Sequence, residues 1–465
     1  MSELWKKSAL TLAAMIRSGE VTSREVVQAH LERIEAVNPA LNAIVEVRPD
    51  EVLAEADRAD VAQREGRALG MLHGVPFTVK TNVDLAGYHT TQGAVRLKDL
   101  LATRDAPTVE RMRAAGGVPL ARTNMPDVGL RINTESSLYG ACHNPWRSGY
   151  TAGGSSGGEG AALAAGMTPI GLGNDIGGSV RNPAFCNGVA SIKPSRGRIP
   201  GGNWSDMMDP ALNTQLMNTQ GIMARTVGDV RAGLEAVMGA HVRDPESHDA
   251  PYHGRPVAKR AALVTAPSGG STHPDVSAGV ALAGEALEAA GYDVVEVEPP
   301  LLVDSFFSWA ELMWSTIAVQ KPLLDAVMGD DARLFLDLTN AEIPAYTQEM
   351  SVAMHQTRYK VARAWREFFM EFPVIVGPTW TQPPFAHGFD IESKESALSV
   401  VELFRFVLPA NLLGLPAACV PTKVINGFPM GAQIIGDRFR EDTCLEAAAA
   451  VEAACGILTP IDPRP

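Results

Sequence analysis

The run Gly173-Asn174-Asp175-Ile176-Gly177-Gly178-Ser179-Val180-Arg181 follows residues 169–172, which predict a buried strand. Two consecutive glycines before Ser179 allow the backbone to turn so tightly that successive N–H groups point at one spot. Such a cluster of donors stabilises the oxyanion of a tetrahedral intermediate. Ser179, at the end of this turn, is therefore predicted to attack a carbonyl group. The alternative interpretation is a glycine-rich turn with a structural role only.

A second glycine-rich run, Gly153-Gly154-Ser155-Ser156-Gly157-Gly158, precedes a small, apolar stretch that predicts a buried helix over 158–165. Residues 153–157 match Gly-x-Ser-x-Gly, the nucleophile elbow of α/β-hydrolases, so an esterase with Ser155 as nucleophile is one hypothesis. That fold needs a downstream histidine, and the first three candidates lie in a polar segment, 240–260. No Gly-Lys-Ser/Thr follows, which excludes a Walker phosphate loop. We favour Ser155 as a proton relay.

Lys80 ends the apolar stretch Gly74-Val-Pro-Phe-Thr-Val-Lys80, which predicts a short buried strand. Loss of hydration lowers the pKa of an ammonium group, and a neutral amine accepts a proton. A lysine that reaches solvent or an ion-pair partner is the structural alternative. Together, one buried lysine and two serines in glycine-rich turns predict a serine nucleophile that is activated without histidine.

These three segments together resemble the amidase signature family, whose members hydrolyse carbon–nitrogen bonds with a Ser-Ser-Lys triad. Lys80 and Ser155 are 75 residues apart, Ser155 and Ser179 are 24 apart, and the resemblance extends to the run at 427–433. It implies that Ser179 is acylated, that Ser155 follows a cis peptide bond and relays the proton, and that Lys80 is the general base and acid. It also implies further roles: the backbone N–H groups of Ile176, Gly177, Gly178 and Ser179 as oxyanion hole, Asp175 and Arg181 as supports of the loop, and Gly129, Leu130 and Asn182 as substrate-lining residues.

One departure from the family pattern and one group of large side chains bear on the chemistry of the site. Position 174 is usually Thr or Ser in the family and is Asn here, so one hydrogen bond to the catalytic network must be remade. An apolar cavity for an aryl or alkyl group is predicted from several large side chains, with core packing as the alternative role. These side chains are Trp204, Met207, Met208 and the aromatic and methionine residues of 306–314: Phe306, Phe307, Trp309, Met313 and Trp314.

The composition is that of a large globular chain: 465 residues, 46% of them hydrophobic and 20% charged. Alternating strand and helix patterns predict an α/β fold. The resemblance specifies the amidase signature fold, a large central mixed β-sheet covered by helices on both faces. We expect a single amidase domain over 1–465, with the signature core at about 66–230. A strand-helix-strand unit is expected at about 261–300 and substrate-cover helices at about 301–372.

Charge and cysteine content restrict the partners. The formal net charge is −13 without a basic cluster, so neither nucleic acid nor an anionic membrane is expected to bind. The five cysteines form no Cys-x-x-Cys pair, and they are expected to be reduced core thiols of a cytoplasmic protein. The alternative to a structural role is a catalytic thiol at Cys186, but no partner base for it is evident in the sequence. The first residues lack the apolar core of a signal peptide, and no stretch reaches transmembrane length.

The sequence therefore predicts an amidase without cofactor or metal, a monomer or homodimer, that acts on a small apolar or aryl amide. Anilides, hydrazides, carbamates (urethanes) and, as a side activity, esters present a carbonyl to the same serine. The alternatives are the glutaminase-type subunit of a tRNA-dependent amidotransferase and the α/β-hydrolase esterase described above.

Overall fold

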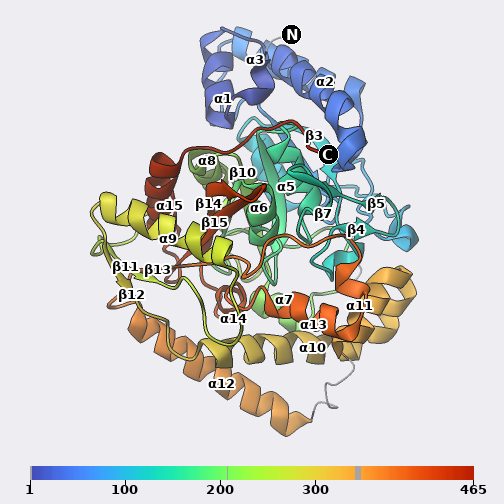
Figure 1. Ribbon diagram of the computed structural model, residues 1–465. Coiled ribbons are helices and arrows are strands. Elements are labelled where there is room, and N and C mark those ends of the chain that lie inside the picture. Colours follow the sequence, from blue (N-terminus) through green and yellow to red (C-terminus); the bar gives the residue numbers. More distant parts are fainter. Residues whose placement is uncertain (1–2, 207, 341–346) are drawn as a thin grey trace.

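The computed structural model describes residues 3–206, 208–340 and 347–465, and one large β-sheet organises them (Figure 1). Eleven strands follow the order β1-β3-β2-β8-β10-β9-β14-β15-β13-β11-β12. The sheet is mixed: β2 is parallel to β3 and β8, and β11 is parallel to β12 and β13. The other neighbours run antiparallel. Two two-stranded sheets, β4-β5 and β6-β7, lie outside it.

The bounds of the strands and helices are as follows. The strands are β1 (Ile44–Val47), β2 (Pro76–Lys80), β3 (Val118–Thr123), β4 (Glu135–Ser136), β5 (Gly140–Ala141), β6 (His143–Asn144), β7 (Arg147–Thr151), β8 (Ile170–Asp175), β9 (Ala190–Lys193), β10 (Thr219–Ala224), β11 (Arg260–Leu263), β12 (Asp293–Glu296), β13 (Val374–Gly377), β14 (Ala417–Ile425) and β15 (Phe428–Gly436). The α-helices are α1 (Ala9–Ser18), α2 (Ser23–Leu41), α3 (Pro49–Arg64), α4 (Pro107–Ala114), α5 (Gly157–Ala164), α6 (Arg181–Asn187), α7 (Leu212–Met217), α8 (Val227–Val237), α9 (Pro274–Ala289), α10 (Leu302–Val327), α11 (Asp330–Asn340), α12 (Gln348–Phe368), α13 (Lys394–Glu402), α14 (Leu408–Leu412) and α15 (Glu441–Cys455). The short 3-10 helices are η1 (Glu3–Lys6), η2 (Val95–Leu97), η3 (Asp127–Gly129) and η4 (Phe389–Ile391).

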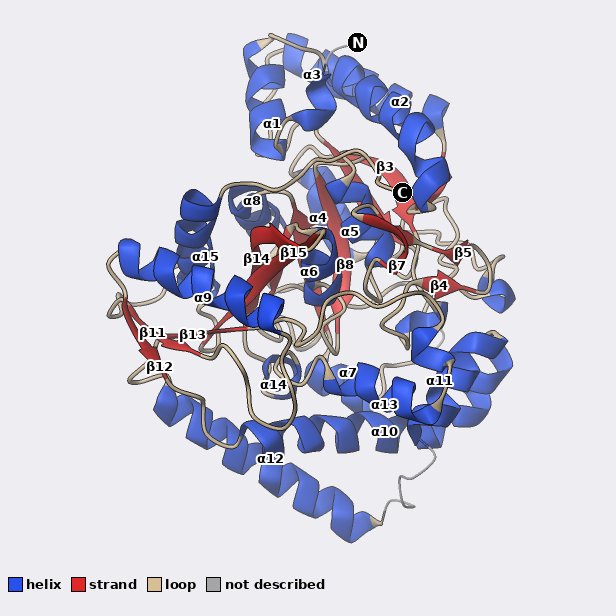
Figure 2. Ribbon diagram, viewed as in Figure 1, coloured by secondary structure: helices blue, strands red, loops and turns tan. Residues whose placement is uncertain are grey.

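Both faces of the central sheet are buried, because successive side chains of a strand point to opposite faces. In β15, Ile434 packs with α1, α8, α9 and α15 on one face, and Ile435 packs with α6, α10, α13 and α14 on the other. Ile222 and Met223 of β10 divide in the same way. Figure 2 shows helices on either side of the strands. The predicted α/β fold with a helix-covered mixed sheet is confirmed.

The helical cover is uneven along the sheet. Helices α1–α3 lie at one end of the molecule, and the long helices α10 and α12 run along the opposite edge (Figure 1). The segment predicted as strand-helix-strand at 261–300 consists of β11, α9 and β12, and it joins the same sheet through β13. In the described part of the chain, no helix is long and apolar enough to cross a membrane.

Candidate active site

Lys80 reaches the site from the last position of β2, a strand that lies between β3 and β8. Its side chain is fully buried, and Nζ lies 2.7 Å from Ser155 Oγ and 3.0 Å from Asn174 Oδ1. Burial lowers the pKa of Lys80 from 10.5 to about 7, although the carboxylates of Asp175 and Glu159 oppose this. A substantial fraction of this amine is therefore neutral near pH 7. The hydrogen bond expected to be remade at position 174 is made by the Asn174 amide.

The serine loop packs its backbone against neighbouring backbone, which explains its glycines. A Cβ at position 158 would lie 2.4 Å from the Asn124 nitrogen, and one at position 154 would lie 2.6 Å from the Ile132 carbonyl carbon. The peptide bond between Gly154 and Ser155 is cis, as the resemblance implies. Helix α5 begins two residues after Ser155, so its first turn fixes the loop.

The two serine-bearing loops meet through their backbones. The N–H of Ser156 donates to the carbonyl oxygen of Ser179 at 3.2 Å. Within the described ranges, the Ser155 and Ser179 hydroxyls share no direct hydrogen bond. Ser179 is 5% exposed and lines a cavity, whereas Ser155 lies behind it, next to Lys80. A proton path from Ser179 to Lys80 through Ser155 therefore needs the Ser179 hydroxyl to turn toward Ser155.

The loop before Ser179 is organised by Asp175, which is fully buried. One carboxylate oxygen accepts hydrogen bonds from the Gly178 N–H at 2.7 Å and from Arg181 Nη2 at 3.0 Å. Burial alone would raise the pKa of Asp175, but the Arg181 guanidinium holds this pKa well below its ordinary value. The Gly178 N–H, expected in the oxyanion hole, is thus engaged by Asp175. The N–H groups of Ile176, Gly177 and Ser179 remain as candidate donors.

Arg181 connects this loop to the C-terminal third of the chain. Its Nη1 donates to the Val407 carbonyl and to Gln433 Oε1, both at 2.8 Å, and its Nη2 donates to Asn411 Oδ1 at 2.6 Å. Asn411 in turn donates to Asp175 at 2.9 Å. Asp175 and Arg181 therefore lie where supports of the loop are expected to lie, behind Ser179.

An apolar cavity opens in front of Ser179, between the loop of residues 129–132 and helices α10, α11 and α13. Of the three residues expected to line it, Gly129 and Leu130 do so. Asn182 does not, because it is fully buried behind the loop. There its amide nitrogen donates to the carbonyls of Gly177 at 3.2 Å and Gly154 at 3.4 Å. The full lining is Gly129, Leu130, Arg131, Ile132, Ile176, Gly177, Ser179, Trp309, Met313, Trp314, Ile317, Phe335, Leu336, Val401 and Phe404.

The aromatic residues expected to line this cavity divide into two groups. Trp309, Met313 and Trp314 line it. Phe306 and Phe307 lie one helical turn away, beside a separate hollow, and Phe307 is 59% exposed. Phe306 and Phe307 precede Met313 and Trp314 by seven residues, so they lie on the same side of α10 and are separated from the cavity by their position along the helix axis.

The prediction is wrong for Trp204 and Met208. The Trp204 ring lies against the Arg104 guanidinium, 3.6 Å from ring centroid to Cζ, and Met208 borders a different, polar cavity. Met207 lies outside the described residues.

The sequence analysis missed two residues that lie near Lys80 and Asn174. Glu159 of α5 is fully buried, accepts hydrogen bonds from Thr78 and Thr123, and lies close enough to Lys80 to affect its charge. Burial raises the pKa of Glu159 to about 7. Asn82 exchanges amide hydrogen bonds with Asn174. A lone acid inside a small-residue helix was the only possible clue to Glu159.

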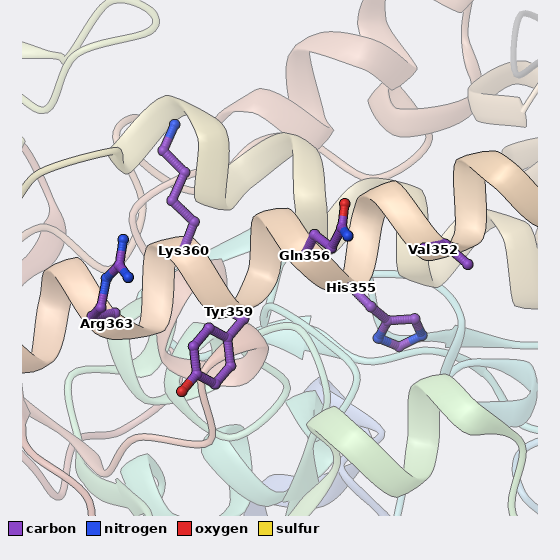
Figure 3. Close-up of a pocket in the computed structure, with 6 residues that line it drawn as sticks. All are labelled: Val352, His355, Gln356, Tyr359, Lys360 and Arg363. Atoms are coloured by element: carbon purple, nitrogen blue, oxygen red, sulfur yellow. The ribbon is translucent and has the colours of Figure 1, made fainter.

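Four other depressions on the described part of the chain do not contain the predicted catalytic side chains. Figure 3 shows one on the surface of α12, and all the residues that line it belong to this helix: Val352, His355, Gln356, Tyr359, Lys360 and Arg363. Cys186, the alternative nucleophile, is fully buried, and burial raises its pKa well above 9. Across the described ranges, no group of three or more His, Cys, Asp and Glu side chains is arranged to hold a metal ion.

Comparison with known proteins identifies the family. The Amidase family model matches residues 25–445, and the chain belongs to the amidase signature family of amide hydrolases. It is 40% identical to the indoleacetamide hydrolase of Bradyrhizobium diazoefficiens, over 98% of this chain and 88% of that protein. It is 33% identical to the acylamidase of Rhodococcus erythropolis, over 96% of this chain and 95% of that protein.

A solved structure agrees with this assignment. The chain superposes on a bacterial aryl acylamidase of the amidase signature family with a TM-score of 0.83 and 26% identity, over 97% of both chains. The α/β-hydrolase hypothesis is thereby wrong: Ser155 contacts a lysine in a different fold. The Gly-x-Ser-x-Gly match has a different physical cause: Gly153 has a φ of +75°, and a Cβ on Gly157 would lie 2.3 Å from Thr134 Oγ1.

Proposed function

We propose that this amidase hydrolyses a small aryl amide through an acyl-enzyme on Ser179. The observation that carries the proposal is the buried contact of 2.7 Å between Lys80 Nζ and Ser155 Oγ, directly behind a serine at the mouth of an apolar cavity. A neutral lysine takes the proton of Ser155 as Ser155 takes that of Ser179, and the Ser179 oxygen bonds to the amide carbon. The backbone N–H groups of Ile176, Gly177 and Ser179 receive the developing oxyanion.

Collapse of the tetrahedral intermediate breaks the carbon–nitrogen bond. The leaving amine takes a proton from Ser155, which regains one from Lys80, and an ester remains on Ser179. Water then attacks this ester by the same route in reverse, which releases the acid and restores the serine. The roles of Lys80, Ser155 and Ser179 support each other, since each group needs the next to move one proton.

The apolar wall supports an aryl acyl group. Trp309, Trp314, Phe335 and Phe404 present rings to the cavity, and a pocket with few polar groups favours an aromatic substituent. Among the described residues of the wall, the one cation is Arg131, which is paired with Asp390 at 2.5 Å.

The same wall bears on the amidotransferase alternative. Its described residues offer no free charge for the amino and carboxylate groups of glutamine, since Arg131 is already neutralised by Asp390. A glutaminase-type role is therefore not favoured. Indole-3-acetamide, the substrate class named for the Bradyrhizobium relative, is the first candidate.

The test combines a substrate panel with variants. The panel contains indole-3-acetamide, an anilide, a hydrazide, an aryl carbamate, an aryl ester and glutamine, compared by kcat/KM. We expect the aryl amide to lead, Ser179→Ala and Lys80→Ala to abolish turnover, and mass spectrometry of a quenched reaction to find the acyl group on Ser179. Full activity of either variant, or an adduct on Ser155, would refute the assigned roles.

A further inference from the structure

Trp309 of α10 lies directly on the loop that leads to Ser179. Its indole N–H donates to the carbonyl oxygen of Ile176 at 2.9 Å. Its ring packs so closely that a Cβ on Gly177 would lie 2.7 Å from Trp309 Cζ2. The ring is 4% exposed and meets Phe404 edge to face, with 6.2 Å between centroids. The indole position is therefore fixed from two sides.

This hydrogen bond determines the direction of a neighbouring donor. The Ile176 carbonyl and the Gly177 N–H belong to one planar trans peptide unit, so they point in opposite directions. In the described part of the chain, Trp309 is the one hydrogen-bond partner of the Ile176 carbonyl. Glycine at position 177 gives this peptide little resistance to rotation. The indole N–H therefore fixes the direction in which the Gly177 N–H points.

The next peptide unit of the loop is held in the same way but serves another purpose. Asn182 donates to the Gly177 carbonyl at 3.2 Å, and the N–H at the other end of that unit, Gly178, donates to Asp175 at 2.7 Å. That unit is held at both ends by protein groups. The unit between Ile176 and Gly177 is held at its carbonyl end, and its N–H has no partner among the described residues. This unit therefore has a donor left for a ligand, and its direction is set by a side chain of the cavity wall.

We propose that Trp309 is a positioning residue for oxyanion stabilisation, through its indole N–H on the Ile176 carbonyl. The inference rests on the proposed function, in which the Gly177 N–H receives the oxyanion. The indole ring then has two separable roles. Its face borders the cavity for the acyl group, and its N–H orients a donor that matters most in the transition state. A donor aimed before the reaction begins costs no reorganisation when charge develops.

The decisive variants separate the N–H from the ring. Trp309→Phe keeps an aromatic ring without the donor, and Trp309→3-benzothienylalanine keeps the shape of indole while sulfur replaces the N–H. We expect either change to lower kcat for the aryl amide about 10- to 100-fold and to leave KM within about threefold. Trp314→Phe is the matched control: it alters the same wall without touching the loop, and we expect its main effect in KM.

A second measurement, the affinity for a ketone that forms an oxyanion on the enzyme, tests oxyanion stabilisation directly. An aryl trifluoromethyl ketone forms a bond from Ser179 Oγ to its carbonyl carbon, the serine proton passes to Lys80, and the former carbonyl oxygen becomes an alkoxide. We expect the Trp309 variants to bind this ketone more weakly by the factor lost in kcat, and to bind the product acid with nearly unchanged affinity. Circular dichroism and thermal midpoints establish that each variant is folded.

The outcomes distinguish this inference from the proposed function. Activity of Ser179→Ala would refute the function, whatever Trp309 does. If Ser179→Ala is inactive and the benzothienyl variant keeps its kcat and its affinity for the ketone, the function stands and the role of Trp309 is refuted. If the Trp309 and Trp314 variants change kcat and KM by equal factors, the role of Trp309 is also refuted. Such a result would show that Trp309 acts only as a residue of the cavity wall.

Discussion

Two buried groups at the site, with opposite charges in their ionised forms, lie close enough to affect each other's charge. Burial lowers the pKa of Lys80 to about 7 and raises the pKa of Glu159 to about 7. The Glu159 carboxylate favours the ammonium form of Lys80, and the ammonium favours the carboxylate. Because the two groups interact, their protons are lost in steps that belong to the pair. The base in the proposed mechanism is the neutral amine of Lys80.

The first prediction concerns the pH dependence of the reaction. In the proposed mechanism activity requires neutral Lys80, so kcat/KM should rise with pH through a limb near pH 7. Glu159→Gln removes a charge that raises the pKa of Lys80, and the limb should therefore move to lower pH. The measurement is kcat/KM for an aryl amide between pH 5 and pH 9.

A second buried lysine supplies the control for that assignment. Lys193 ends β9, is fully buried, and also has a pKa lowered to about 7, by burial and by the charge of Arg181. Its Nζ donates to the Pro194 carbonyl at 2.9 Å. Lys193→Met should keep the acidic limb where it is. If the limb disappears in this variant, the limb reports the titration of Lys193, and its assignment to Lys80 is wrong.

The second prediction concerns Asn174, the departure from the usual Thr or Ser. A neutral Lys80 that donates to Asn174 Oδ1 at 3.0 Å turns its lone pair toward the hydroxyl of Ser155. Asn174→Ala should lower kcat about 10-fold, the effect of one hydrogen bond to an ionisable group, with KM nearly unchanged. Steady-state kinetics at pH 8 measures this.

Companion variants at this pair test the direction of the effect. Asn82→Ala should cost less, because Asn82 only orients the Asn174 amide and borders a polar cavity of about 560 Å³ from which water can replace it. Asn174→Ser should recover part of the activity of Asn174→Ala. A larger loss in Asn82→Ala than in Asn174→Ala would contradict the proposed orientation of the lysine.

At the scale of elements, the sheet positions the proposed reacting groups, and the cover helices form much of the cavity wall. Strands β2 and β8 bring Lys80 and the loop of Ser179 together, because parallel neighbours end at the same edge. Helices α10, α11 and α13 bring apolar side chains over that edge. The proposed reacting groups thus come from residues 80–179, and much of the cavity wall comes from residues 309–404.

The third prediction follows from this division. Leu336 of α11 lines the cavity and is 1% exposed, so Leu336→Ala should enlarge the space for the acyl group. The ratio of kcat/KM for a bulky aryl amide to that for a small one should rise about 10-fold. Unfolding stability should fall by about 2–5 kcal/mol.

Leu324→Ala is the matched control for Leu336. Leu324 belongs to the same apolar cluster and is 9% exposed, but it does not line the cavity. Its replacement should reduce stability without changing the preference for acyl size. Equal shifts in preference for both variants would show a general loosening of the cover helices.

The sequence predicts the catalytic edge far better than the cavity wall. Lys80, Ser155 and Ser179 lie in short runs whose glycines have local physical causes. The cavity is also lined by residues of α11, of α13 and of the loop after α13. These residues reach the cavity only through tertiary packing, and the local sequence of the two helices is that of ordinary apolar helix faces. The prediction of Trp204 as a wall residue was wrong because its contact with an arginine guanidinium produces no periodic pattern in the sequence from which it could be predicted.

At the scale of the whole molecule, the sheet encloses Lys80 and Lys193 in a core that excludes water. Each pKa falls from 10.5 to about 7, which corresponds to a cost on the order of 4–5 kcal/mol per lysine below pH 7. Between about pH 7 and pH 10.5 the unfolded chain binds these protons and the folded chain does not. Unfolding stability from these two groups therefore rises with pH across that window and is lowest below it.

The fourth prediction tests this linkage with the lysines replaced. Lys80→Met and Lys193→Met each remove one group whose cost is full at pH 6 and smaller at pH 9. Relative to the unchanged protein, each variant should gain more stability at pH 6 than at pH 9, by about 2–3 kcal/mol. Urea unfolding at the two pH values measures the difference, and Lys259→Met, at an exposed position, should show none. A gain that is the same at both pH values would mean that the buried lysines keep their protons up to pH 9. In that case Lys80 would not serve as the base of the reaction.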